Sequence, residues 1–212
     1  NGIHGPLSLN QVEVVEDVLL VNGQQPDFIL LNNDLTDEGL QGLSSAHILP
    51  NPQMGWHNRK KSMHFEHLRS LVEEVSEIIG IDPWHLLCDS FVSENKCLEK
   101  ETCRVKLAEE VDLFIELLSK RYQSMGLDRA PVVYVKNNRG TYGLGIMTVT
   151  SGDQLLSLSN RKMKKLMYGK GTADVEDFLI QEGVPTLMKT DQGFPVEPVV
   201  YLVDGDASSW FY

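Results

Sequence analysis

The chain has 212 residues, of which 42% are hydrophobic, and this is enough for one large globular domain or two small ones. Its 30 acidic and 19 basic residues give a formal charge of −11, which argues against a nucleic-acid partner because it repels phosphate backbones. No stretch approaches the roughly 20 apolar residues that span a bilayer, and the first ten residues hold no signal-peptide hydrophobic region, so we expect a cytoplasmic protein without membrane contact.

The N-terminal half of the chain predicts one strand and one helix. Residues 27–34, DFILLNND, read as a buried strand whose polar end could face a ligand, although a turn rich in Asn and Asp explains them equally well. Residues 40–55 are predicted to form a loop, because prolines in this segment break regular secondary structure. From Phe65 to Ile79 apolar residues recur at helical spacing, and Gly80 supplies a stop, which predicts an amphipathic helix.

The C-terminal half predicts a mixture of helices and strands. A second amphipathic helix is expected from about Val105 to Met125, with Gly126 after it. The remaining expected elements are strands over 132–135 and 146–149, a short helix capped by Ser151, a helix over 161–167, and strands over 178–184 and 197–205. The fold class is therefore α+β or α/β.

A lysine and three glycines follow the predicted strand at 132–135. Lys136 ends this apolar run, where a charge normally needs a partner, and the segment 140–145 contains Gly140, Gly143 and Gly145. Glycines allow tight turns in which backbone N–H groups can approach an anion. The arrangement suits a polyphosphate, although a glycine-rich hairpin with a surface lysine is the plainer alternative. The P-loop and dinucleotide glycine patterns are both absent from the segment.

The order of these features resembles a known fold. A strand ending in Lys136, a glycine hairpin, helices and the strand FLIQEGVP (178–185) are similar to the nucleotide-binding part of the ATP-grasp fold. More narrowly, six segments between residues 27 and 204 resemble successive signatures of the bacterial ATP-grasp-type glutamate-cysteine ligases: DFILLNNDL, GWHNRKKSMHF, IIGIDPW, GTYGLGIMTV, QEGVPT and EPVVYLVD. This resemblance implies an α/β substrate-domain portion over residues 1–100 and a nucleotide-binding region over residues 101–212.

The resemblance also implies an activity. The expected enzyme joins the γ-carboxylate of L-glutamate to L-cysteine through an acyl phosphate, in the first step of glutathione synthesis, and uses ATP and Mg²⁺. Another ATP-grasp carboxylate-amine ligase and a non-catalytic ATP-binding module remain open as alternatives. The family is longer at both ends, so we expect the chain to be a fragment that is inactive alone. Its metal ligands are expected beyond residue 212, with Asp204 and Asp206 as the nearest candidates here.

The resemblance further implies a set of nucleotide-binding residues. Lys136 would contact the α- and β-phosphates, and a loop would close over them: Gly140, Thr141, Tyr142, Gly143, Leu144 and Gly145. A hinge would read the adenine edge through its backbone: Gln181, Glu182, Gly183 and Val184. Glu182 or a later acid would hold the ribose. A strand end with a turn glycine is the alternative for the hinge.

A basic cluster completes the expected site. The segment GWHNRKKSMHF places His57, Arg59 and Lys61 at the entrance of the first helix of an otherwise acidic chain. A guanidinium and an ammonium beside a helix N-terminus suit the carboxylates of amino-acid substrates, so we expect Arg59 and Lys61 to bind carboxylates, with His57 orienting them. A solvated basic turn is the alternative. One departure from the family lies nearby, because Asn137, Asn138 and Arg139 replace its small and acidic residues and could change how the loop closes.

Overall fold

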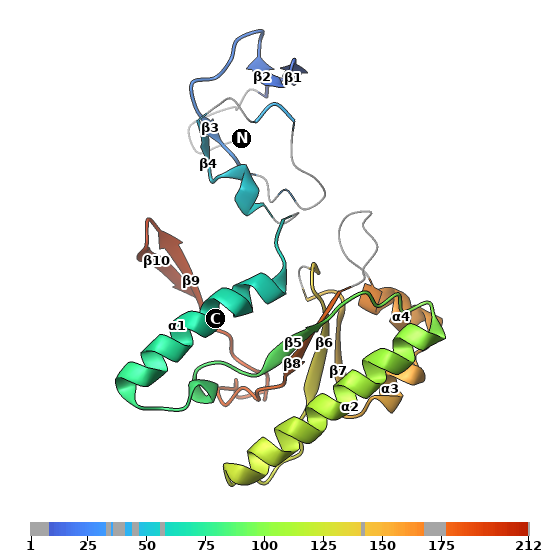
Figure 1. The fold of residues 1–212 in the computed structure, drawn as a ribbon. Coiled ribbons are helices and arrows are strands. Elements are labelled where there is room, and N and C mark those ends of the chain that lie inside the picture. The colour runs from blue at the N-terminus through green and yellow to red at the C-terminus, as the bar shows by residue number, and fades with distance from the viewer. Residues whose placement is uncertain are drawn as a thin grey trace.

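The protein is a mixed α/β structure with one central sheet (Figure 1). The computed structural model describes residues 9–32, 35, 41–43, 47–55, 58–140, 143–167 and 177–211. The strands are β1 (Val12–Val15), β2 (Val18–Val21), β3 (Ile29–Leu30), β4 (Ile48–Leu49), β5 (Ser90–Ser93), β6 (Val133–Asn137), β7 (Ile146–Val149), β8 (Phe178–Glu182), β9 (Val199–Val203) and β10 (Asp206–Phe211). The helices are α1 (Lys61–Ile79), α2 (Glu101–Ser124), α3 (Asp153–Leu156) and α4 (Asn160–Met167), with 3₁₀ turns at Pro52–Met54 and Pro83–His85.

The central sheet has four strands in the order β5-β8-β6-β7, and every neighbouring pair is antiparallel. Its register places Lys136 of β6 opposite Leu179 of β8, and Tyr134 opposite Gln181. Residues that lie directly opposite one another share a face of the sheet, so these four side chains belong to one face. Because β5 precedes residue 100 and pairs with β8, the sheet draws on both expected regions, 1–100 and 101–212.

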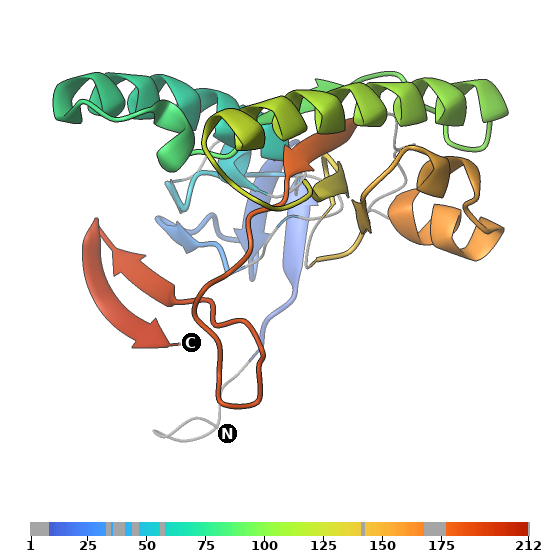
Figure 2. The ribbon, with the colours of Figure 1, turned by 90° about the horizontal axis from the view of Figure 1, so that it is seen from below.

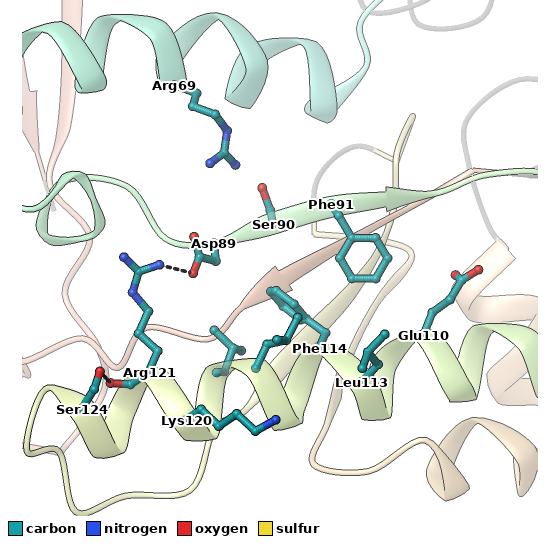
Figure 3. A pocket seen from close by; sticks show the side chains of 12 residues that line it. Arg69, Asp89, Ser90, Phe91, Glu110, Leu113, Phe114, Lys120, Arg121 and Ser124 are labelled. Atoms are coloured by element: carbon teal, nitrogen blue, oxygen red, sulfur yellow. Dashed lines mark hydrogen bonds and ion pairs between the residues drawn. The ribbon is translucent and has the colours of Figure 1, made fainter.

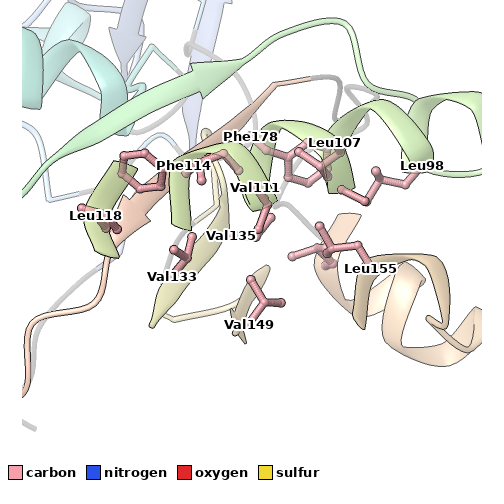
Figure 4. Packing of buried hydrophobic residues seen from close by; sticks show 13 residues of the cluster. Leu98, Leu107, Val111, Phe114, Leu118, Val133, Val135, Val149, Leu155 and Phe178 are labelled. Carbon is pink, nitrogen blue, oxygen red and sulfur yellow. The ribbon is translucent and has the colours of Figure 1, made fainter. Parts of the chain in front are cut away.

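The main core lies on the other face of the sheet, beneath α2 (Figure 4). Successive side chains of a strand point to opposite faces, and Val133 and Val135 are fully buried in this core while Tyr134 and Lys136, which alternate with them, are only half-buried. From α2 the core receives Val111 and Leu118, both on the apolar face that the sequence predicts. The predicted helix is therefore confirmed, although it begins at Glu101 rather than near Val105.

Helix α1 lies near the opposite face of the sheet and confirms the first predicted helix. It ends at Gly80, whose φ of 71° is the left-handed conformation that glycine adopts without steric cost. Its N-terminal turns face the sheet, since Ser62 and Phe65 line a small pocket together with Leu179. Its C-terminal part is more open, and Ile78 is 76% exposed. Strand β6 thus lies between a closed core and a face that α1 covers only in part.

Two expectations from the sequence are wrong, one about a strand and one about a helix cap. The segment 27–34 is not a buried strand: β3 has two residues, pairs in parallel with β4, and leaves Leu30 75% exposed. Asn33 and Asp34 lie outside the described residues. Ser151 does not cap α3, because Gly152 occupies the N-cap position and makes no side-chain cap hydrogen bond.

Two hairpins lie apart from the central sheet. Strands β1 and β2 pair with each other, which the sequence did not predict, and β9 pairs with β10. Figures 1 and 2 show the β9–β10 hairpin projecting away from the sheet, and its residues after Val200 are exposed. Within the described part of the chain, no helix combines the length and apolar character needed to cross a membrane.

Candidate functional site

A chain of polar contacts crosses the open face of the sheet. The ammonium of Lys136 donates a 2.5 Å hydrogen bond to the side-chain oxygen of Gln181, whose amide nitrogen donates to the sulfur of Cys88 at 2.8 Å. Burial lowers the pKa of Lys136 and raises the pKa of the Cys88 thiol. No carboxylate of the described residues forms an ion pair with Lys136. The face therefore presents a half-buried cation whose bonded partner is a neutral amide.

A turn over residues 137–140 follows this lysine and leads into the glycine loop, residues 140–145. The N–H of Asn137 donates to the carbonyl of Gly145 at 2.7 Å, and the N–H of Gly140 donates to the carbonyl of Asn137 at 3.1 Å. Gly143 has a φ of 70°, in the left-handed region that a β-carbon makes costly. Thr141 and Tyr142, which complete the expected loop, lie outside the described residues. The described ends of the loop are thus held together by backbone hydrogen bonds beside Lys136.

The start of α1 is bonded to this loop. The backbone N–H of Lys61 donates to the carbonyl of Asn138 at 2.9 Å, and the N–H of Ser62 donates to the side-chain oxygen of Asn138 at 2.9 Å. The side-chain amide of Asn138 donates back to the hydroxyl of Ser62 at 2.9 Å. Asn138 is 2% exposed. In the sequence Asn138 stands out only because the family has small or acidic residues at this place. In the folded protein its hydrogen bonds attach the loop to the start of α1.

The side chain of Lys61 reaches the same loop. Its ammonium donates to the carbonyl of Asn137 at 2.8 Å and also to the carbonyl of Gly140. The pKa of Lys61 is lowered to about 8, mainly by burial and further by the positive charges of Lys136 and Arg59. The structure therefore brings Lys61 of the basic cluster beside the glycine loop. Arg59 is exposed there, and His57 lies outside the described residues.

The four residues expected to form the hinge do not all face the same way. The carboxylate of Glu182 accepts hydrogen bonds from Tyr122 and from the Trp84 indole, both at 2.7 Å, and from the N–H of Asp89 at 3.1 Å. Glu182 is 2% exposed, whereas Gln181, its neighbour, contacts Lys136 on the open face. The expectation that Glu182 could hold a ribose therefore needs correction, because both carboxylate oxygens already bond groups on the core side of the sheet.

The last two hinge residues lie beside a small pocket. The N–H of Gly183 donates to the carbonyl of Val132 at 2.7 Å, and a β-carbon at Gly183 would lie 2.8 Å from that same oxygen. Val184 is exposed, and its N–H has no hydrogen-bond partner among the described residues. The pocket of about 230 Å³ is lined by both residues together with Tyr134. It is smaller than the roughly 300–1,000 Å³ of a drug-sized ligand site, so it suits a flat ring rather than a whole nucleotide.

A metal site is not evident in the described part of the chain. No group of three His, Cys, Asp or Glu residues there could hold a metal ion. Asp204, with a φ of 51°, and Gly205 form the turn between β9 and β10, and Asp206 pairs with Val203 just after it. The two aspartates are thus parts of a hairpin turn, and the described residues do not fit a Mg²⁺ site.

A larger groove lies at the open edge of β5 and was not expected from the sequence (Figure 3). It has a volume of about 980 Å³ and runs between α1 and α2. Arg69 points toward it from α1, and Phe114 and Leu113 line it from α2. On its wall Arg121 bonds to Asp89 at 2.9 Å. The groove shares no lining residue with the hinge pocket, but it shares Arg69, Ser90 and Phe91 with the small pocket between α1 and the Lys136 face of the sheet.

The fold and site define a mixed α/β protein with a cationic, glycine-looped sheet face, and comparison with known proteins gives the family. The family described as GshA, glutamate-cysteine ligase, matches residues 3–212. The chain therefore belongs to the glutamate-cysteine ligase family. Comparison with proteins of curated function gave no match.

Two solved structures resemble the chain. A proposed gamma-glutamylcysteine synthetase from Methylobacillus flagellatus KT is 30% identical, with a TM-score of 0.66 over 82% of this chain and 41% of that one. The chain thus spans about two fifths of that protein's length. D-alanyl-alanine synthetase A from Vibrio cholerae is 11% identical, with a TM-score of 0.43 over 94% of this chain and 49% of that one. The second likeness is too weak to carry an argument.

Proposed function

We propose that the protein is an ATP-dependent carboxylate-amine ligase of the ATP-grasp type, which joins the γ-carboxylate of L-glutamate to the amine of L-cysteine in the first step of glutathione synthesis. Membership of the glutamate-cysteine ligase family supports the proposal. The structural observation that carries it is the position of Lys136 between the glycine loop and the hinge, on the sheet face away from the core.

The nucleotide would lie along this face. Lys136 would contact the α- and β-phosphates, since its half-buried ammonium, which bonds the neutral amide of Gln181 and lies 5.2 Å from the ring centroid of Tyr134, gains a charge-assisted bond when an anion arrives. Gly140, Gly143 and Gly145, with Thr141 and Tyr142, would close over the phosphates and exclude water. Gly183 and Val184 would hold the adenine edge, because the N–H of Val184 lacks a partner among the described residues. Gln181 would orient Lys136, and Glu182 would hold the hinge from behind.

The amino-acid carboxylate would lie beside the loop, at the basic cluster. Arg59 is exposed and close enough for its charge to lower the pKa of Lys61, which itself bonds the loop. A fork-shaped guanidinium suits bidentate binding of a carboxylate. We assign this role to Arg59, with His57 as its partner, and the short separation from the loop would bring the carboxylate near the γ-phosphate.

The proposed chemistry needs no nucleophilic side chain. An oxygen of the glutamate γ-carboxylate would attack the γ-phosphorus of ATP, so that an acyl phosphate forms and ADP leaves. The cysteine amine would then attack the acyl carbon, the carbon–oxygen bond to phosphate would break, and the nitrogen would lose a proton. Lys136 and the loop would stabilise the charge that develops on the phosphates. Mg²⁺ is expected for such a reaction, but the described residues offer no ligand set that fits it.

The test is product formation by the full-length protein with ATP and Mg²⁺. We expect phosphate release that requires both glutamate and cysteine, together with a product of the mass of γ-glutamylcysteine. Replacing cysteine with other amino acids tests the amine, and the variant Lys136→Met serves as the inactive control. Phosphate release without any peptide product, or a product that forms only with a different amine, would contradict the proposed reaction.

A further inference from the structure

The clearest feature that the proposed function leaves unused is the attachment of α1 to the glycine loop. We propose that Lys61 is a positioning residue for the nucleotide: its side chain fixes the loop from Asn137 to Gly140 in the shape that receives the phosphates, before any ligand binds. This inference rests on the proposed function, since it concerns the same phosphate site. It gives Lys61 a role different from that of a carboxylate ligand.

The hydrogen bonds of Lys61 carry the argument. Its ammonium contacts two carbonyl oxygens three residues apart in the chain, those of Asn137 and Gly140. Both residues are buried, and a buried carbonyl without a partner costs free energy. Since the carbonyl of Asn137 also accepts from the N–H of Gly140, this cost falls mainly on the carbonyl of Gly140. The same cation thus ties together the first and last residues of the turn from Asn137 to Gly140. Two of its three N–H groups are already used in this way, so little remains for a substrate carboxylate.

A second set of bonds holds the backbone of α1 at the same place. The N–H groups of Lys61 and Ser62 both donate to Asn138, and Asn138 donates back to the Ser62 hydroxyl. These bonds fix where α1 begins, and therefore fix the origin of the Lys61 side chain. Because the backbone and the ammonium of Lys61 both bond this turn, its side chain loses less conformational entropy in forming these bonds than a lysine from a distant segment would lose.

The surrounding charges explain why this clamp favours a polyphosphate. Lys61, Lys136 and Arg59 are cations that lie near one another, and no carboxylate of the described residues forms an ion pair with either lysine. Like charges held together repel each other, and the approach of phosphates relieves that repulsion. Lys61 therefore positions the loop through its hydrogen bonds and adds to the positive potential beneath it.

The first experiment follows amide hydrogen exchange without nucleotide. In Lys61→Met we expect exchange at Asn137 and Gly140 to become roughly tenfold faster or more, because the opening of this turn no longer breaks charge-assisted bonds. The amides of Val133 and Val135 in the sheet should keep their wild-type rates. The matched control is Lys60→Met, since the ammonium of Lys60 lies 3.6 Å from a carboxylate oxygen of Asp177 and does not bond the loop. Unchanged loop exchange, or equal acceleration throughout the sheet, would overturn the inference.

The second experiment separates the two substrates in the full-length protein. We expect Lys61→Met to raise the KM for ATP by roughly tenfold while the KM for glutamate stays near the wild-type value, and Lys61→Arg, which keeps several donors, to recover part of the loss. A rise confined to glutamate would overturn the inference and make Lys61 a carboxylate ligand. If the wild-type protein binds no nucleotide, the proposed function fails, and the exchange experiment alone decides whether Lys61 holds the loop.

Discussion

The hydroxyl of Tyr122, on α2, donates a 2.7 Å hydrogen bond to the buried carboxylate of Glu182, at the end of β8. The indole of Trp84 and the N–H of Asp89 donate to the same carboxylate. These bonds join α2, the 3₁₀ turn at Pro83–His85 and β8 at the point where the hinge begins. The core side of the sheet therefore fixes the proposed hinge in place, while its other side faces the proposed nucleotide.

Replacing Glu182 should destabilise the fold. Glu182→Ala leaves one buried and two partly buried donors without their acceptor, so we expect the free energy of unfolding to fall by about 2 kcal/mol or more. Urea unfolding followed by tryptophan fluorescence measures this change. Tyr122→Phe removes one of the three donors and should cost only about 1 kcal/mol. A Glu182→Ala protein with nearly wild-type stability would show that the carboxylate is not structural.

Gly183→Ala should disturb the hinge for a steric reason. The added β-carbon would lie 2.8 Å from the carbonyl oxygen of Val132, which cannot retreat without weakening its 2.7 Å hydrogen bond from the Gly183 N–H. We expect a loss of about 1–3 kcal/mol of stability and weaker nucleotide binding. Val184→Ala, at the exposed neighbour, should change stability by less than about 0.5 kcal/mol. Equal unfolding midpoints for the two variants would rule out the close contact.

Arg59→Lys tests the proposed carboxylate site. Lysine keeps the charge but cannot reproduce bidentate geometry, so we expect the KM for glutamate to rise by roughly tenfold while the KM for ATP is spared. Steady-state kinetics of the full-length protein with each substrate varied in turn measures both constants, and Lys60→Met controls for the loss of a neighbouring cation. An effect on ATP alone would move Arg59 to the phosphate site.

The depressed pKa of Lys61 predicts a pH dependence of stability. Its folded-state pKa is about 8, below the ordinary 10.5, so between these values the unfolded chain binds a proton that the folded protein does not. The free energy of unfolding of the wild type, measured relative to Lys61→Met, should therefore rise with pH across this window, by at most roughly 1.4 kcal/mol per pH unit. Urea unfolding of both proteins at about pH 7.5 and about pH 9.5 provides the comparison. A difference that falls with pH would mean that the fold stabilises the cation.

Local patterns predicted much of the fold. Helix α2 was recognised because its apolar positions recur at the helical period and the core uses that same face, with Val111 and Leu118 buried. The segment 27–34 was wrongly predicted to be a buried strand, because an apolar run is usually buried. In the structure β3 pairs with β4, which has two residues. An apolar run does not by itself reveal whether a second layer covers it.

The site was harder to predict because its contacts are not local. The ammonium of Lys61 and the carbonyl of Gly140 are 79 residues apart, and no periodicity connects them. The role of Glu182 did have a signal in the sequence: Gln181 and Glu182 are neighbours in a strand, so their side chains must point to opposite faces and only one of them can face a ligand. Strand alternation alone therefore assigns these two side chains to different faces of the sheet.

The most direct test of the proposed nucleotide site is the affinity of the folded protein for a non-hydrolysable ATP analogue with Mg²⁺, measured by calorimetry. We expect saturable binding that Lys136→Met weakens by about 2 kcal/mol or more, because a charge-assisted phosphate contact is lost. Lys106→Met, at an exposed position of α2, should bind as the wild type does. Equal affinities for the wild type and a folded Lys136→Met would contradict the proposed nucleotide site.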